Sequence, residues 1–142
     1  TGRPLSHLQT QFDELAAEAN CRVVTLEWPR AELHGRIERR VEQMFASGFV
    51  EEVRRLRAQY ATWSRTALQA VGYAEVADHL DGKADLATTI ELVQARTRQF
   101  ARRQETWFRS LTECRRWPLS EAAGPLPPAD EIAGQIFDLT NR

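Results

Sequence analysis

The segment from Asp85 to Ser110 most constrains the fold, because it predicts a single helix that is the longest in the chain. At about 100° per residue, one side of this helix carries an apolar series with two polar interruptions, namely Val93, Thr97, Phe100, Gln104, Trp107 and Leu111. We predict that this side faces the protein interior. The segment therefore predicts a domain built mainly from helices.

The two polar residues on this side, Thr97 and Gln104, need an explanation. A buried threonine or glutamine costs about 1 to 3 kcal/mol unless its polar atoms find partners. One explanation is that each bonds to a backbone group of a neighbouring loop. The other is that this side borders a site where a polar ligand edge, such as a base, completes the bonding. The sequence leaves both open.

The same helix holds RTRQFARRQETWFR, residues 96–109, with five arginines and a single acidic residue, Glu105. Because the formal charge of the whole chain is only −1, any affinity for nucleic acid must come from where the arginines lie. Guanidinium groups bind phosphate bidentately and stack on bases, and a nearby aromatic ring adds about 1 to 3 kcal/mol per stacked base.

The arginines of this segment fall into two sets. Arg96 and Arg103 flank the side of Phe100 and Trp107, where a ligand lying along the helix would meet them. The other set points to the opposite side and consists of Arg98, Arg102 and Arg109. The alternative is a solvated basic face paired with acidic neighbours, which the lone acid of the segment makes less favoured.

A second helix is predicted from Arg30 to Phe45, ended by Gly48. Its series Leu33, Ile37, Arg40, Met44 places Arg40 on the apolar side, with Arg36 one turn earlier on the same flank. Two arginines one turn apart suit a diphosphate or a phosphate backbone. A buried salt bridge to a local glutamate, for instance Glu75, is the alternative.

Shorter elements complete the prediction. We expect two short strands, a largely buried one at Cys21–Trp28 and another within residues 113–120. We expect a short helix capped by Ser6, and a second one after Gly48 with Phe49, Val50, Val53 and Leu56 on one face. A third runs from about Tyr73 to a turn at Asp81 and Gly82. A last helix follows a proline-containing linker and includes Ile132, Ile136 and Leu139.

Composition narrows the functional classes. Cys21 and Cys114 form no CxxC pair, and the three histidines show no zinc-ligand spacing, so we predict no structural metal and a reduced, cytoplasmic setting. No apolar run approaches the length of a membrane span, and no signal peptide opens the chain. Because the chain begins at Thr1 rather than at methionine, we expect a piece of a longer protein.

Four motifs occur in order, TGRPLSHLQ, LHGRIERRVEQMFASGFVEEVRRL, ALQAVGYAEVADHLDGK and RTRQFARRQETWFR. Together, from Thr1 to about Trp117, they resemble the C-terminal half of the tRNA dimethylallyltransferase family, also called tRNA isopentenyltransferases. The resemblance implies an α/β P-loop fold, of which this segment supplies mostly helices and one or two short strands belonging to a parallel sheet. Residues 1–120 would then be part of the catalytic domain, and residues 121–142 a linker and terminal helix.

The resemblance also implies a reaction. It is the transfer of a dimethylallyl group from dimethylallyl diphosphate to N6 of the adenosine on the 3′ side of the anticodon, assisted by Mg²⁺. The target base is flipped out of its stack into a channel, as chemistry on a base requires. The implied partners are the tRNA anticodon stem-loop and dimethylallyl diphosphate, with no membrane, and we expect a monomer.

Site residues follow from the matching motifs. Arg36 or Arg40 would face the diphosphate. The residues matching tRNA-contacting stretches are Gln69, Ala70, Val71, Gly72, Tyr73, Ala74, Arg96, Arg102, Arg103, Gln104, Thr106, Trp107 and Arg109. Gly72 would let backbone and nucleic acid approach closely while Tyr73 offers a stacking face. The alternative is a helix-start glycine beside a core tyrosine.

The sequence also departs from the family. It contains no phosphate-cradling GxxxxGK[ST] loop, and the family's catalytic aspartate and channel threonine belong to the half not present. We therefore expect no catalytic residue here, no activity of the segment alone, and Mg²⁺ bound mainly by the other half. The alternatives are a stand-alone helical RNA-binding module without catalysis, or a purely structural domain that satisfies Thr97, Gln104 and Arg40 internally.

Overall fold

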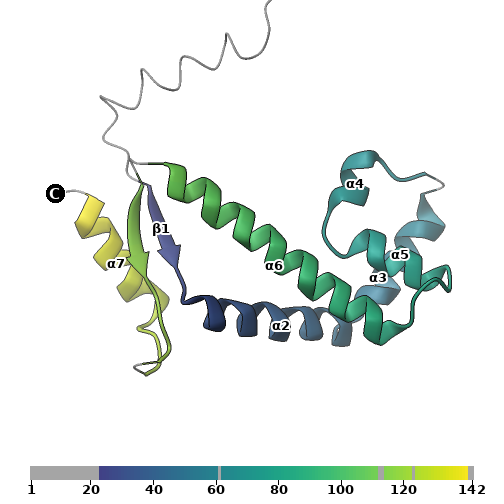
Figure 1. Cartoon of the computed structure of the whole chain (residues 1–142), viewed down its shortest axis with the longest axis horizontal. Coiled ribbons are helices and arrows are strands. Elements are labelled where there is room, and N and C mark those ends of the chain that lie inside the picture. The colour runs from purple at the N-terminus through teal and green to yellow at the C-terminus, as the bar shows by residue number, and fades with distance from the viewer. Residues whose placement is uncertain (1–22, 61, 112–113, 123, 141–142) are drawn as a thin grey trace, which may run out of the picture. The chain divides into compact units, whose positions relative to one another are not determined.

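The computed structural model describes residues 23–60, 62–111, 114–122 and 124–140, and Figure 1 shows them as mainly helical. The elements are β1 (Val24–Glu27), α2 (Arg30–Ala46), α3 (Phe49–Gln59), α4 (Arg65–Gln69), α5 (Tyr73–Leu80), α6 (Leu86–Ser110), β2 (Arg115–Pro118) and α7 (Ala129–Thr140). The helix expected after Ser6 and the first two residues of the expected strand, Cys21 and Arg22, lie outside the described residues.

The chain divides into two compact units. The helical unit comprises residues 29–106, and the strand unit comprises the described residues before 29 and after 106. Helix α6 begins in the helical unit and ends in the strand unit. Among the described residues, no helix combines the length and the apolar character that a bilayer crossing requires.

The strand unit contains β1 and β2, which pair in parallel with Val24 opposite Arg115 and Glu27 opposite Pro118. Both expected strands and their parallel sheet are thereby confirmed. The expectation that the first strand is largely buried is wrong, because Val24 and Thr25 are half-buried while Leu26 is 49% exposed. Among the described residues β1 has a single strand neighbour, and one neighbour leaves much of a short strand uncovered.

The core of the helical unit has two adjoining clusters. In one, Ile37 and Val41 of α2 pack against Val93 of α6. In the other, Phe49 and Val53 of α3 pack against Val76 of α5. These side chains are at most 8% exposed, and the pairs on α2 and α3 are four residues apart, a spacing typical of one helix face.

Glycines set the boundaries of these helices. Gly48, with φ +96°, separates α2 from α3, as expected, and Gly82, with φ +75°, lies in the expected turn after α5. Helix α4 is not among the helices that the sequence predicted, because five residues are too few to show an apolar period. Its first turn is capped by Ser64, whose Oγ accepts the backbone N–H of Ala67 at 3.1 Å.

The predicted inward side of α6 is correct only near its start. Val93 is buried and Thr97 half-buried, but Phe100 is 45% exposed, Trp107 is 59% exposed, and Gln104 is exposed. The partly buried positions continue from Thr97 in steps of four, through Ala101 and Glu105. The prediction continued from Thr97 to Phe100, a step of three instead of four. Each later position was therefore one residue too early, which places the expected face about 100° away from the observed one.

Arg40 of α2 shows the same error. The buried residues of this helix are Ile37 and Val41, four residues apart, and Arg40 is exposed. The expectation that Arg40 points to the edge of the core is therefore wrong. Its side chain is open to solvent, and burial does not force the guanidinium to bind an anion.

Candidate nucleic-acid interface

The exposed part of α6 within the helical unit carries Phe100, Arg103 and Gln104. The Arg103 guanidinium carbon lies 5.7 Å from the centroid of the Phe100 ring. This cation–π contact restrains the guanidinium beside an exposed aromatic face. An arginine held next to a ring can bind a phosphate while the ring stacks on a base. The sequence predicted that these residues lie together.

The two polar residues of the predicted inward side have separate explanations. The Thr97 hydroxyl donates a 2.7 Å hydrogen bond to the Val93 carbonyl within α6. Thr97 thus follows the first alternative, internal satisfaction, although its partner is in the same helix and not in a loop. Gln104 is exposed, so no burial cost arises for it. Thr106 resembles Thr97, since its hydroxyl donates to the Arg102 carbonyl at 2.9 Å.

Arg96 lies beside a buried acid. Its Nη1 is 2.5 Å from Oε1 of Glu75, whose side chain is 3% exposed, whereas the Arg96 side chain is 58% exposed. The other carboxylate oxygen, Oε2, accepts the backbone N–H of Gly72 at 2.9 Å. Glu75 therefore joins the start of α5 to the basic helix. The sequence proposed Glu75 as a partner for Arg40, but the structure pairs it with Arg96.

Arg98 is also paired. Its Nη1 lies 3.0 Å from Oε1 of Glu38 on α2. The single acid within residues 96–109 does not show how many of these arginines are paired, because the acidic partners of Arg96 and Arg98 lie on other helices. Arg102 and Arg109 are exposed, as are Arg103 and Trp107. Trp107 and Arg109 belong to the strand unit, where the Trp107 ring contacts Phe108 edge-on at 4.8 Å between centroids.

The segment from Gln69 to Ala74 ends α4 and begins α5. Gln69 and Ala70 are exposed, Val71 packs against the cluster of α2 and α6, and Gly72 is buried. A Cβ added to Gly72 would lie 2.9 Å from Cε1 of Phe49, and φ at this glycine is +102°. The local alternative, a helix-start glycine in the core, therefore accounts for Gly72. A contact of this segment with RNA stays a prediction.

Tyr73, the next residue, is half-buried. Its hydroxyl donates a 2.7 Å hydrogen bond to Oε1 of Glu52, and this bond, together with burial and the carboxylate charge, raises the pKa of Tyr73 above its ordinary value. The Tyr73 ring meets Phe49 and Trp63 edge-on, with centroids 5.2 and 6.1 Å apart. These contacts fix the ring orientation.

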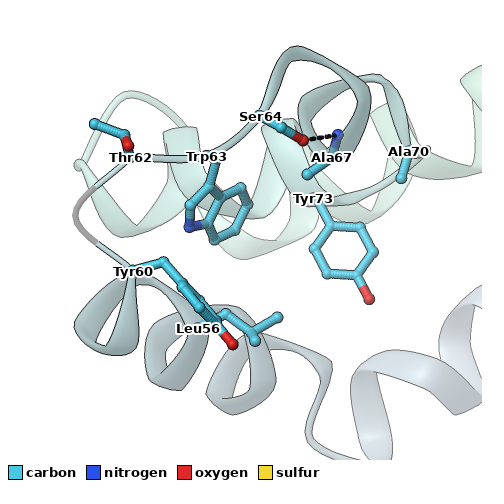
Figure 2. Close-up of a pocket in the computed structure, with 8 residues that line it drawn as sticks. All are labelled: Leu56, Tyr60, Thr62, Trp63, Ser64, Ala67, Ala70 and Tyr73. Atoms are coloured by element: carbon cyan, nitrogen blue, oxygen red, sulfur yellow. Dashed lines mark hydrogen bonds between the residues drawn. The ribbon is translucent and has the colours of Figure 1, made fainter.

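Tyr73 also lines a pocket of about 450 Å³ in the helical unit. Figure 2 shows the lining residues, which are Leu56, Tyr60, Thr62, Trp63, Ser64, Ala67, Ala70 and Tyr73. Two of them, Ala70 and Tyr73, belong to the segment that the sequence analysis matched to tRNA contacts. The sequence analysis did not predict the pocket, because its walls form only when residues 56–73 fold back on themselves between α3 and α5.

The remaining candidates are on α2. Arg36 and Arg40 are both exposed, and the choice between them for a diphosphate stays open. In the part of the chain that the structure describes, no three histidine, cysteine, aspartate or glutamate side chains gather as metal ligands.

Comparison with known proteins gives consistent matches. A family model described as IPP transferase matches residues 1–111. The tRNA dimethylallyltransferase of Rhodopirellula baltica is 47% identical over 115 residues, covering 81% of this chain and 34% of the relative. That of Kineococcus radiotolerans is 42% identical over 139 residues, covering 98% of this chain and 42% of the relative. The chain thus spans well under half the length of these relatives.

Solved structures agree. The crystal structure of the full-length tRNA isopentenylpyrophosphate transferase from Bacillus halodurans matches with a TM-score of 0.72 and 29% identity, covering 87% of this chain and 38% of that one. The tRNA delta(2)-isopentenylpyrophosphate transferase from Staphylococcus epidermidis matches with a TM-score of 0.66 and 29% identity, covering 82% and 38%.

Proposed function

Because this chain belongs to the IPP transferase family, we propose that it forms part of a tRNA dimethylallyltransferase and supplies residues that hold the tRNA substrate. The observation that carries the proposal is the family match over residues 1–111, which includes the basic segment of α6. The reaction is transfer of a dimethylallyl group from dimethylallyl diphosphate to N6 of the adenosine on the 3′ side of the anticodon.

The chain's own role is binding and electrostatic stabilisation. Arg103, held against Phe100, binds an RNA phosphate, and Gln104 offers its exposed amide to a base or ribose. Arg36 or Arg40 stabilises the negative charge that the diphosphate leaving group carries in the transition state. The P-loop and the catalytic aspartate come from residues outside this sequence, so the segment alone is inactive.

The remaining parts of the proposal concern setting and metal. Mg²⁺ would neutralise charge on the diphosphate and would be held mainly by residues outside this sequence, so we derive no step through it. Residues 1–120 would belong to the catalytic domain, and residues 121–142 would form a linker and terminal helix. We propose a monomeric, cytoplasmic protein.

A chimera tests this function. The segment of the Rhodopirellula baltica relative that matches this chain is replaced by the chain itself, and transfer from labelled dimethylallyl diphosphate to an anticodon stem-loop is measured. We expect transfer by the chimera. Arg103→Ala should raise KM for RNA about tenfold, as expected for a lost phosphate or stacking contact. Arg54→Ala, on α3 and paired with Glu51, is the matched control and should leave KM unchanged. A folded chimera without transfer would refute the proposal.

A further inference from the structure

The pocket of Figure 2 lies wholly in the helical unit, between the end of α3, the connection to α4, α4 itself and the first residue of α5. Its volume of about 450 Å³ is within the range of small-ligand sites. Three of its lining residues are aromatic, Tyr60, Trp63 and Tyr73, and Figure 2 shows their rings around a common space. Ala67 and Ala70 are short and leave that space open.

The surface that lines the pocket is mostly apolar, and two of its polar side chains are already engaged. Ser64 Oγ already accepts from Ala67 N–H, and the Tyr73 hydroxyl already donates to Glu52. A ligand with many polar atoms would therefore find few partners here. A flat ring suits the walls, because ring faces can stack on aromatic side chains and require no hydrogen bonds there.

The aromatic rings are preorganised and accessible. Trp63 is held edge-on to Tyr73 with centroids 6.1 Å apart, and Tyr73 is held in turn by Phe49. Tyr60 remains 53% exposed, which is a large area for an aromatic side chain without a partner to cover it. A stacked ring would cover this area with little loss of side-chain freedom.

The charge around the pocket favours a polyanion. Residues 49–73 contain four arginines and two glutamates, and with Asp81, the partner of Arg57, the excess is one positive charge. Arg54 pairs with Glu51 and Arg57 with Asp81, whereas Arg55 and Arg65 are exposed next to the lining residues Leu56 and Ser64. Exposed arginines beside an aromatic pocket are typical of sites that bind single-stranded nucleic acid.

We propose that this pocket binds an unpaired base of the RNA substrate by stacking on Trp63 and Tyr60, with little discrimination among bases. The identity of the partner rests on the function proposed above, whereas the pocket and its charge do not. Low discrimination follows because every base has an apolar ring face, and the walls of the pocket are mostly apolar.

The test uses the 142-residue chain and an anticodon stem-loop in which 2-aminopurine, a fluorescent purine, replaces each loop base in turn. We expect one loop position to be quenched on binding. Trp63→Ala should abolish this quenching and weaken binding about tenfold, as expected for one lost stacking contact. Trp63→Phe, which keeps a ring, should retain most of both effects. Leu68→Ala, on α4 but outside the pocket, is the matched control.

Several results would overturn the proposal. If Trp63→Ala keeps the quenching and the affinity while Arg103→Ala weakens binding, RNA binds but avoids the pocket. If Trp63→Ala weakens the binding of an aromatic peptide but not the binding of RNA, the pocket serves a protein partner. If the unmodified chain binds no RNA, both the pocket proposal and the proposed function fail. If RNA binds but avoids the pocket, only the pocket proposal fails, so the two failures can be told apart. If Trp63→Ala does not fold by circular dichroism, Tyr60→Ala takes its place, and unchanged quenching there also overturns the proposal.

Discussion

At the scale of single residues, Gly72 is the position with the least tolerance. It combines a φ of +102° with a missing Cβ whose place lies 2.9 Å from the Phe49 ring. Gly48 also has a positive φ, +96°, but a Cβ there would meet nothing within 4 Å. The two glycines therefore separate backbone strain from crowding.

We expect Gly72→Ala to destabilise the protein by about 1 to 3 kcal/mol more than Gly48→Ala does, because both pay for positive φ but only one overpacks the core. Urea denaturation followed by circular dichroism measures both free energies of unfolding. Equal losses would show that the Phe49 ring moves aside without cost.

Tyr73 makes the free energy of unfolding depend on pH in the alkaline range. Its pKa is raised above the ordinary value of 10.0, mainly by the hydrogen bond to Glu52 and further by burial and by the carboxylate charge. The neutral phenol is the favoured form, so this contribution is complete below pH 10 and disappears as pH rises through the folded-state pKa.

Tyr73→Phe should therefore cost about 1 kcal/mol at neutral pH, the usual net value of one hydrogen bond, and less above pH 10. The measurement is the free energy of unfolding of both proteins across the alkaline range. A difference that stays constant with pH would contradict the assigned role of the Glu52 bond.

At the scale of elements, most helices follow from apolar spacing, but the orientation of a face depends on single steps. On α2 the buried series runs from Ile37 to Val41, and on α6 the partly buried series runs from Thr97 to Ala101. The sequence pattern admits steps of three as well as four. Only the neighbouring helix decides between them, because it covers one side.

The pair of Glu75 and Arg96, which joins α5 to α6, should be asymmetric. Arg96→Gln leaves a carboxylate with a 3% exposed side chain without its cation, whereas Glu75→Gln leaves a guanidinium with a 58% exposed side chain that water can solvate. We expect Arg96→Gln to lower the free energy of unfolding more than Glu75→Gln.

The same denaturation series tests this asymmetry. The double variant should be more stable than Arg96→Gln alone, because it removes the unpaired buried charge. Equal losses in the two single variants would mean that Glu75 is hydrated in solution.

At the scale of the whole molecule, the formal charge of −1 does not show that some arginines are paired with acids while others are exposed. Arg98 is committed to Glu38 on α2, whereas Arg103 lies against Phe100 on an exposed surface. A phosphate contact requires a cationic side chain that can reach the RNA and displace the counterions condensed on it. A small net charge is therefore compatible with the RNA binding that we propose.

We expect Arg103→Gln to reduce the slope of log K against log salt concentration for stem-loop RNA by about one, as for one lost phosphate contact. Arg98→Gln, in the same helix and also removing one positive charge, should leave the slope unchanged. Fluorescence anisotropy across a salt series measures both. Equal slopes for the two variants would show that overall charge, and not position, governs binding.

The sequence by itself determined every described helix except α4, the two parallel strands, the turn at Gly82 and the resemblance to the family, because these depend on local spacing and on the order of motifs. It did not determine the partners of Arg96 and Arg98, the reason for Gly72, or the pocket beside Tyr73. The first three depend on residues that are at least twenty positions apart along the chain, and the pocket depends on how the chain folds back between α3 and α5, so only the tertiary structure decided them.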